Sequence, residues 1–361
     1  MQRIAVIGGG IAGLTVALRR ARAGDRVVVF EGAAALGGQL ASESSDGFVV
    51  EHGAEGFLAR SDVVPALAAD AGIADHIVEQ LEQRSFCFDG TQLRELAPGE
   101  AGRLLGFQVA TEELGRGIRS FLHGMGELPE RLAHGLSGQV ELRLESAVKR
   151  IEPGAGGVVV TPANANANAE AFTSVVIASN ARSCAGVLGD AFGPVAHALA
   201  DSALLSSLTV SLAFRRERIL HPLDGTGFIV PDPEQLSGVR AVTFVSSKLP
   251  HRAPAGGALL RLFFRPSDHD LVALSDRAWA ERAESALGRA LPLSGPADRA
   301  WISRWPAALP VFDDSHRARV AALESALTGQ RIWLAGSAFH GSGIDAAIRS
   351  AERAALSVAH A

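Results

Sequence analysis

The chain contains no tyrosine and very few lysines, cysteines and methionines. Without tyrosine there is no tyrosyl chemistry, and because Lys149 and Lys248 are the only lysines, few lysine-based mechanisms are open to it. The only cysteines, Cys87 and Cys184, do not form a C-x-x-C pair. We therefore expect two reduced core thiols in a cytoplasmic protein, and no metal site.

The chain also lacks an excess of charge and a long apolar run. Its formal net charge is -5 with 20% charged residues, so nothing in its electrostatics favours nucleic acid as a partner. The apolar stretch 4–18 contains glycine and threonine and has no charged region before it, so we expect neither a membrane span nor a signal peptide. With 47% hydrophobic residues, 361 residues are enough for two globular domains.

The first 31 residues carry the strongest pattern. The apolar run 4–7 is typical of a buried parallel strand and leads directly into G-x-G-x-x-G at Gly8, Gly10 and Gly13. A helical pattern covers 14–23, and a second β-branched run ends at Glu31. Strand, glycines, helix, strand and acid in this order predict a dinucleotide-binding site.

Each part of this unit has a physical task. Gly8 permits the tight turn, Gly10 lets a pyrophosphate approach the backbone, and Gly13 lets the helix pack against the strand. The amino terminus of the helix offers free N–H groups and the positive end of a dipole to the phosphates. Glu31, 18 residues after Gly13, is placed to accept the hydroxyls of an adenosine ribose.

The middle of the chain is rich in strand patterns. Hairpins are predicted around Asp46-Gly47 and Asp89-Gly90. The runs 158–160 and 175–178 are predicted to pair with each other across an Asn/Ala-rich hairpin tip. An antiparallel sheet is predicted from four further runs, 208–214, 227–231, 240–246 and 258–264.

The end of the chain has the same order of patterns as its beginning: an apolar run, a glycine turn and a helix. The apolar run 332–335 leads into a glycine turn, Gly336 to Gly343, and then into a helical pattern from Asp345. Because glycine turns of this kind occur at both ends, we predict that both ends build one nucleotide-binding domain and that the middle forms a second. The predicted fold is α/β: a Rossmann-like domain from 1–83, 138–188 and 328–361, and an α+β substrate domain with an antiparallel sheet from 84–137 and 189–327.

Further motifs occur in a fixed order along nearly the whole chain. They are Leu36-Gly37-Gly38, Asp46-Gly47-Phe48, Glu51-His52-Gly53, the hairpin 84–94, Phe121 to Met125 with Leu128-Pro129, Arg304 to Pro310 with His316, and Gly336 to Ile344. Together they resemble the glutathione-reductase-like FAD oxidoreductases of the amine-oxidase superfamily. Within that group the chain is most similar to the protoporphyrinogen and coproporphyrinogen oxidases.

The resemblance implies non-covalently bound FAD, a hydride passing from a substrate C–H bond to flavin N5, and oxygen as electron acceptor. The opening unit alone allows NAD or FAD, and the second glycine turn favours FAD. The amino terminus of the last helix is expected to face the pyrimidine end of the flavin. The residues expected to contact FAD are Gly8, Gly10, Ile11, Ala12, Gly13, Glu31, Gly37, Gly38, Gln39, Val148, Trp305, Gly336, Gly341, Gly343 and Ile344.

The resemblance also implies a tetrapyrrole-like substrate that is aromatised in two-electron steps. Arg84 matches the position of a carboxylate-binding arginine, although an arginine that opens a hairpin is commonly a solvated surface residue. His52, His316 and His340 are either proton acceptors or structural histidines. No side chain is assigned a catalytic role, because the flavin carries the chemistry.

Three departures from the family pattern stand out. Only about thirty residues separate Arg94 from Gly124, where the family carries a long helical insertion that covers the substrate and docks on membranes. Its absence argues against membrane attachment. Gln39 stands where the family has a basic residue near the FAD phosphates, and His340 lies in the closing turn.

Two other functions stay open. One is a dehydrogenase or desaturase of the same superfamily that acts on another apolar substrate. An amine oxidase fits less well, because the run 208–214 has no lysine and an aromatic cage would have to form without tyrosine. The other is a non-catalytic protein that binds a flavin or a porphyrin.

Overall fold

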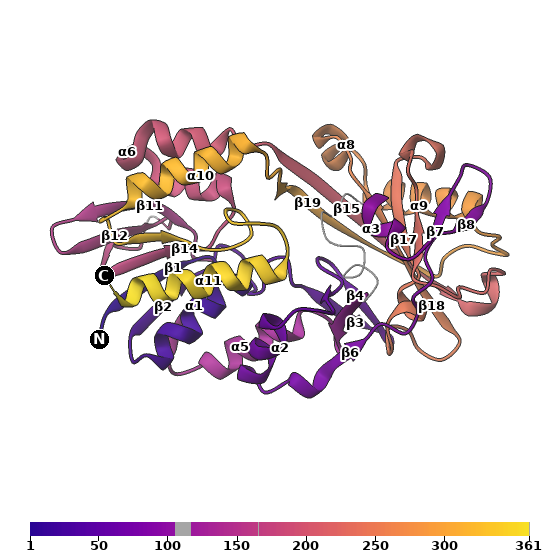
Figure 1. The fold of residues 1–361 in the computed structure, drawn as a ribbon, viewed down its shortest axis with the longest axis horizontal. Helices are drawn as coiled ribbons and strands as arrows, with labels where there is room; N and C mark the ends of the chain where they lie inside the picture. Colours follow the sequence, from indigo (N-terminus) through magenta and orange to yellow (C-terminus); the bar gives the residue numbers. More distant parts are fainter. Residues whose placement is uncertain (105–116, 165, 361) are drawn as a thin grey trace.

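A five-stranded parallel sheet forms the centre of one lobe (Figure 1) in the computed structural model, which describes residues 1–104, 117–164 and 166–360. In spatial order its strands are β10 (Val140–Arg143), β2 (Arg26–Phe30), β1 (Arg3–Ile7), β14 (Ser174–Ile177) and β20 (Ile332–Leu334). Both neighbours of β1 run parallel to it. The apolar runs of β1 and β14 are buried because helices or strands cover both faces.

Two layers cover this sheet. One face packs against α1 (Ile11–Arg22), α2 (Val63–Asp70), α5 (Glu127–Leu136) and α11 (Ile344–Ala359). The other face packs against α6 (Ala181–Ala200), α10 (Asp314–Leu327) and the antiparallel sheet β11 (Val148–Gly154), β12 (Gly157–Pro162) and β13 (Glu170–Phe172). None of the described helices combines the length and the apolar character needed to cross a bilayer.

The two ends of the chain lie together in this lobe. Figure 1 shows α1 beside α11, and the two helices pack against each other. The Gln2 amide donates a hydrogen bond to the carbonyl oxygen of Val358 at 3.0 Å, and Arg19 pairs with Glu352 at 2.8 Å. The prediction of an α/β fold in which both chain ends build one parallel sheet is confirmed.

A seven-stranded sheet forms the second lobe. Its spatial order is β19 (Arg299–Pro310), β15 (Leu204–Arg215), β18 (Gly257–Phe264), β17 (Val239–Thr243), β16 (Gly227–Ile229), β7 (Phe86–Phe88) and β8 (Leu93–Glu95). All neighbours are antiparallel except β16 and β7. The four predicted central strands and the 84–94 hairpin are therefore confirmed, except that the predicted strand 240–246 ends at Thr243 and its last two residues begin a short helix.

Two long strands, β15 and β19, run from the first lobe into the second (Figure 1). One side of the seven-stranded sheet packs on α9 (Asp276–Ala290) in an apolar core. The elements α3 (Glu100–Leu104), α7 (Val245–Lys248) and α8 (Asp268–Ala273) complete this lobe. Short strands lie between the lobes: β3 (Ser42–Ser45) with β4 (Phe48–Glu51), and β5 (Phe57–Leu58) with β9 (Ile118–Phe121) and β6 (Ile77–Glu79).

Two expectations differ from the structure. The runs 158–160 and 175–178 do not pair, because the short strand β13 follows β12 and leaves β14 free to join the parallel sheet. The segments 118–136, 189–200 and 314–327, predicted in the substrate domain, contribute to the cores on the two faces of the parallel sheet. The domain boundaries themselves stay a prediction.

Buried charges join the two lobes. Lys248 Nζ lies 2.7 Å from Glu55 Oε2, and Arg252 Nη2 lies 3.4 Å from Glu51 Oε1. Arg261, in the middle of β18, donates to the carbonyl oxygen of Gly53 at 2.7 Å. Burial raises the pKa of Glu51, and Arg252 offsets only part of this effect. Burial acts in the same direction on Glu55, but Lys248 and Arg261 outweigh it, so the pKa of Glu55 is lowered.

We expect Glu55→Gln to lower the free energy of unfolding at pH 7 by about 3–5 kcal/mol, because Lys248 would keep a buried charge without its partner. The pKa of Glu55 is lower in the folded protein than the ordinary glutamate value of about 4.3. Its contribution is therefore complete well above that ordinary value and is lost as the pH falls through the lowered folded-state value. Urea unfolding at pH 7 and in acid should show the difference from wild type shrinking in acid.

The matched control is Glu281→Gln, which breaks the exposed pair with Arg277 and should change stability little. Equal stability of wild type and Glu55→Gln at pH 7 would show that the Lys248–Glu55 pair does not hold the lobes together.

Candidate dinucleotide-binding site

A cleft of about 520 Å³ opens at the carboxyl ends of β1, β2 and β14. This is the edge where parallel α/β sheets bind their ligands. The cleft is lined by segments from the beginning, the middle and the end of the chain. The predicted cofactor residues that line it are Gly8, Gly10, Ile11, Ala12, Glu31, Gly37, Gly38, Gln39, Val148, Trp305, Gly336, Gly343 and Ile344.

The glycine loop has the geometry that its motif predicts. Gly8 has a φ of +111°, which side-chain-bearing residues rarely adopt. A Cβ built on Gly13 would overlap the carbonyl oxygen of Gly8, so Gly13 acts beneath the loop and does not line the cleft. A Cβ built on Gly10 would meet nothing nearer than the carbonyl oxygen of Gly37, at 4.0 Å. Gly10 therefore keeps free the space that a ligand would enter.

Three helices begin at the cleft. The first residues of α1, α6 and α11 all line it, through Ile11, Ala181 and Ile344. Neither α1 nor α6 has an acidic residue in its first turn. The first turn of α1 also has no side-chain cap, so its N–H groups are uncompensated, whereas the side chain of Asn180 accepts one N–H of α6. Glu31 is the only charged side chain among the described residues that line the cleft. An anion there would be held by backbone N–H groups and helix dipoles.

Glu31 is held at the end of β2 by two backbone contacts. Its Oε2 accepts from the N–H of Gly9 at 2.7 Å, and its Oε1 accepts from the N–H of Ala33 at 2.8 Å. Each carboxylate oxygen has a second lone pair, so the group can still accept the hydroxyls of a ribose. The contact with Gly9 also ties the predicted ribose acid to the glycine loop.

The second glycine pair closes the cleft next to the first. Gly37 donates its N–H to the carbonyl oxygen of Gly9 at 2.9 Å and has a φ of +108°. The amide of Gln39 donates to the carbonyl oxygen of Ala308 on β19 at 3.2 Å, so Gln39 connects the glycine pair to the long strand. Trp305, also on β19, donates its indole N–H to the carbonyl oxygen of His52 at 2.7 Å.

The closing turn reaches the cleft from the far end of the chain. Gly336, Gly341 and Gly343 all have positive φ values, of +112°, +129° and +91°. Gly343 is the N-cap of α11, and both Gly343 and Ile344 line the cleft. Gly341 does not line it, so its expected contact with a cofactor stays a prediction.

Arg84 lies outside this cleft, at the start of the hairpin in the second lobe. Its side chain is 46% exposed and pairs with Glu95 at 2.9 Å and with Asp224 at 2.5 Å. The guanidinium also lies over the ring of Phe86. A carboxylate-binding role for Arg84 stays a prediction, and a substrate carboxylate would have to compete with two acidic residues.

The three histidines considered as proton acceptors have hydrogen-bond partners at both ring nitrogens. Fully buried His316 contacts Ser202 Oγ and the carbonyl oxygen of Ala338, each at 3.0 Å. His52 contacts Ser303 and Glu43, at 2.8 and 3.2 Å. His340 contacts Ser350 and Glu324, both at 2.7 Å. None of the three lines the cleft, which fits the structural interpretation.

Sequence reasoning missed part of the lining. Ser179 and Asn180 follow β14 directly, and Asn180 caps α6 by accepting from the N–H of Ser183 at 2.9 Å. The sequence does contain a signal for these two residues, because 175–178 is predicted as a strand and the residues after a parallel strand lie at the ligand-binding edge of the sheet. Leu204 and Pro310 also line the cleft from the two long strands. Pro310 ends the motif that begins at Arg304, but no motif marks Leu204.

Two family models match the chain. The model for a flavin-containing amine oxidoreductase matches residues 85–359, and the model for an NAD(P)-binding Rossmann-like domain matches residues 6–71. The chain belongs to the flavin-containing amine oxidoreductases. The family supports a flavin as the cofactor of the cleft, whose glycines and helix amino termini suit a flavin nucleotide.

Curated relatives of this amine oxidoreductase include coproporphyrinogen III oxidases. The Propionibacterium freudenreichii protein is 31% identical over 66% of this chain and 44% of its own length. The Bacillus subtilis protein is 26% identical over 47% and 36%. The chain thus spans less than half the length of these two relatives. The Mycobacterium bovis protein is 26% identical over 99% of this chain and 97% of its own length. That match covers 445 positions, so the relative has segments that this chain of 361 residues lacks.

Solved structures share the fold at low sequence identity. A protein assigned as a protoporphyrinogen oxidase from Exiguobacterium has a TM-score of 0.82 at 22% identity and covers 99% of this chain and 98% of its own. Putrescine oxidase with bound putrescine has a TM-score of 0.77 at 15% identity and covers 100% and 99%. The two proteins differ in substrate, so this likeness shows the fold alone.

We expect Gly10→Ala to weaken FAD binding roughly tenfold or more, because the new methyl group would occupy the space next to the helix amino terminus. Gly10 has extended backbone angles that alanine also adopts, so the apoprotein should keep its stability or gain up to about 1 kcal/mol. Flavin fluorescence titration of the apoprotein and urea unfolding measure the two effects.

The matched control is Gly135→Ala on α5, where a Cβ would meet nothing within 4 Å. It should leave FAD affinity unchanged. Unchanged affinity in Gly10→Ala would mean that the pyrophosphate does not lie against this loop.

Proposed function

We propose that the protein binds FAD non-covalently and oxidises a porphyrinogen in successive two-electron steps, with oxygen as the electron acceptor. The likeness to a coproporphyrinogen III oxidase over 99% of the chain carries this proposal. The dinucleotide cleft supports it, because most of the residues expected to contact FAD line one continuous space. We further propose a cytoplasmic location, supported by two buried, unpaired cysteines.

The donor set of the cleft supports FAD bound without a covalent link. Glu31, tied to the glycine loop, suits the adenosine ribose, and the first turn of α1 suits the pyrophosphate. No cysteine or histidine is among the described lining residues, so none of them offers a thiolate or an imidazole for attachment. We place the flavin ring toward α11, whose amino terminus would stabilise negative charge at the pyrimidine end.

The bound flavin would supply the two-electron acceptor for oxidation of a substrate C–H bond. The protein's own part is to position the ring and to compensate charge. Gln39 connects β19 to the loop that follows β2, and Trp305 connects it to His52, which follows β4. The long strand that leads into the second lobe is therefore fixed against the cleft. The second lobe, which contains the seven-stranded sheet, would bind the substrate and orient it toward the flavin.

The decisive experiment is anaerobic mixing of the flavin-loaded protein with coproporphyrinogen III and, separately, with protoporphyrinogen IX. We expect one of them to bleach the flavin absorption, and oxygen to restore the absorption with formation of the porphyrin. If neither porphyrinogen bleaches a flavin that dithionite does reduce, the protein acts on another apolar substrate or has no catalytic function. A colourless protein that cannot be loaded with FAD would contradict the cofactor proposal itself.

The role proposed for Arg84 has its own test. If Arg84 binds a substrate carboxylate, Arg84→Ala should raise KM for the porphyrinogen about 10- to 100-fold, the effect of losing one charge-assisted hydrogen bond. FAD content should not change, because Arg84 lies outside the cleft. Arg94→Ala is the matched control, since Arg94 is exposed on the neighbouring strand and pairs with Glu100. Unchanged kinetics in Arg84→Ala would show that Arg84 belongs only to its surface ion pairs.

A further inference from the structure

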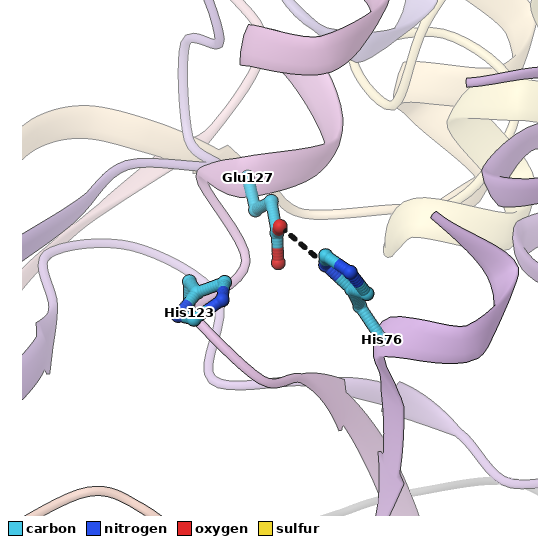
Figure 2. Close-up of side chains that lie close together, drawn as sticks. All are labelled: His76, His123 and Glu127. Atoms are coloured by element: carbon cyan, nitrogen blue, oxygen red, sulfur yellow. Dashed lines mark hydrogen bonds and ion pairs between the residues drawn. The ribbon is translucent and has the colours of Figure 1, made fainter. Parts of the chain in front are cut away.

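Two histidines and a glutamate come together where β6, β9 and α5 meet, and none of them lines the cleft. Figure 2 shows His76, His123 and Glu127 pointing toward one another. Each residue offers one ligand atom, and these three atoms all lie within 4.8 Å of one another. His76 Nδ1 lies 2.6 Å from Glu127 Oε1. No sequence motif predicts this cluster, because His76 is far from the other two residues in the chain.

Rigid backbone holds the three residues in place. His76 ends a short 3-10 helix (Ala74–His76) and precedes β6, while His123 follows β9, which pairs with β6. The N–H of Leu122 donates to the carbonyl oxygen of His76 at 2.8 Å, so the two histidines start from hydrogen-bonded segments. Glu127 is the first residue of α5, and its N–H donates to the carbonyl oxygen of Gly124 at 3.1 Å.

One carboxylate oxygen of Glu127 is buried and unsatisfied within the described part of the chain. Its side chain is only 5% exposed, and Oε2 is buried with no hydrogen-bond partner among the described residues. A buried carboxylate oxygen in this condition carries a desolvation cost, and a bound ion or an ordered water is the usual explanation. The rings of His76 and His123 lie edge to face, with centroids 5.6 Å apart, and each offers a nitrogen within 4.8 Å of a carboxylate oxygen of Glu127.

We propose that His76, His123 and Glu127 form a binding site for a divalent transition-metal ion, with Zn²⁺ as the preferred ion. Two imidazoles and one carboxylate are a common zinc donor set, which leaves a fourth position for water. The nitrogen ligands disfavour Mg²⁺ and Ca²⁺, which select oxygen donors. Ligand atoms around a tetrahedral zinc lie roughly 3.3 Å apart. Metal binding therefore requires the 2.6 Å contact between His76 and Glu127 to lengthen and His123 to move inward, which His123 can do because it is exposed.

The bound metal would cross-link three segments of the chain. It would connect the end of the 3-10 helix, the turn after β9 and the first turn of α5. A Cβ built on Gly37 would lie 3.2 Å from Pro129, so α5 packs closely against the second glycine pair of the cleft. The site would therefore stabilise the support of the cleft. It does not depend on the proposed function, because none of its residues lines the cleft.

The test is calorimetric titration of ZnCl₂ into the 361-residue protein as purified, after dialysis against a chelator. We expect saturable one-to-one binding and a Tm that rises with zinc concentration, because zinc would bind only the folded protein. His123→Ala removes an exposed ligand without disturbing the core and should weaken binding at least tenfold. Glu127→Gln should do the same, and MgCl₂ should neither bind nor raise Tm.

His134→Ala is the matched control, since His134 is an exposed histidine on the same helix outside the cluster. It should bind zinc as the wild type does. The proposal is overturned if wild type shows no saturable binding, if His123→Ala binds zinc with unchanged affinity, or if His134→Ala loses binding to the same extent. In each of these cases the cluster is a His–Glu ion pair only.

Discussion

The close contact between Gly13 and Gly8 is the constraint on which the rest of the structure depends. A Cβ on residue 13 would overlap the carbonyl oxygen of Gly8. Because Gly13 has no side chain, α1 can start shortly after β1 and pack tightly against it. Its bare amino terminus is thereby aimed at the carboxyl edge of the parallel sheet. β14 and α6 deliver a second helix start to the same edge, and β20 and α11 deliver a third. An almost uncharged cleft can therefore attract an anion.

The second lobe depends on the first through two different kinds of link. The long strands β15 and β19 connect them covalently and through a ladder of hydrogen bonds whose register shifts once, between Leu205 and Ser207. Glu51 and Glu55 from the first lobe and Lys248, Arg252 and Arg261 from the second add buried charge pairs. Such pairs contribute little net stability compared with apolar packing, but they penalise any other arrangement of the lobes. They fix the sheet of the second lobe relative to the cleft.

Much of the fold follows from local patterns, and the failures have physical reasons. Strand–glycine–helix units at both chain ends, the hairpin at Asp89-Gly90 and the central antiparallel strands are readable because each signal lies within a few residues. The wrong pairing of 158–160 with 175–178 arose because β13 is too short to show a period. The charge pairs between the lobes and the His76–His123–Glu127 cluster have no local signal, since their members meet only through tertiary packing.

Hydrogen exchange of the apoprotein with and without FAD tests most directly whether both chain ends hold one dinucleotide. The account predicts that FAD protects backbone amides in 8–13 and in 336–344 together, while the hairpin 84–94 in the second lobe exchanges as before. Protection confined to 8–13 and Glu31 would contradict it, because the closing turn would then take no part in binding the cofactor.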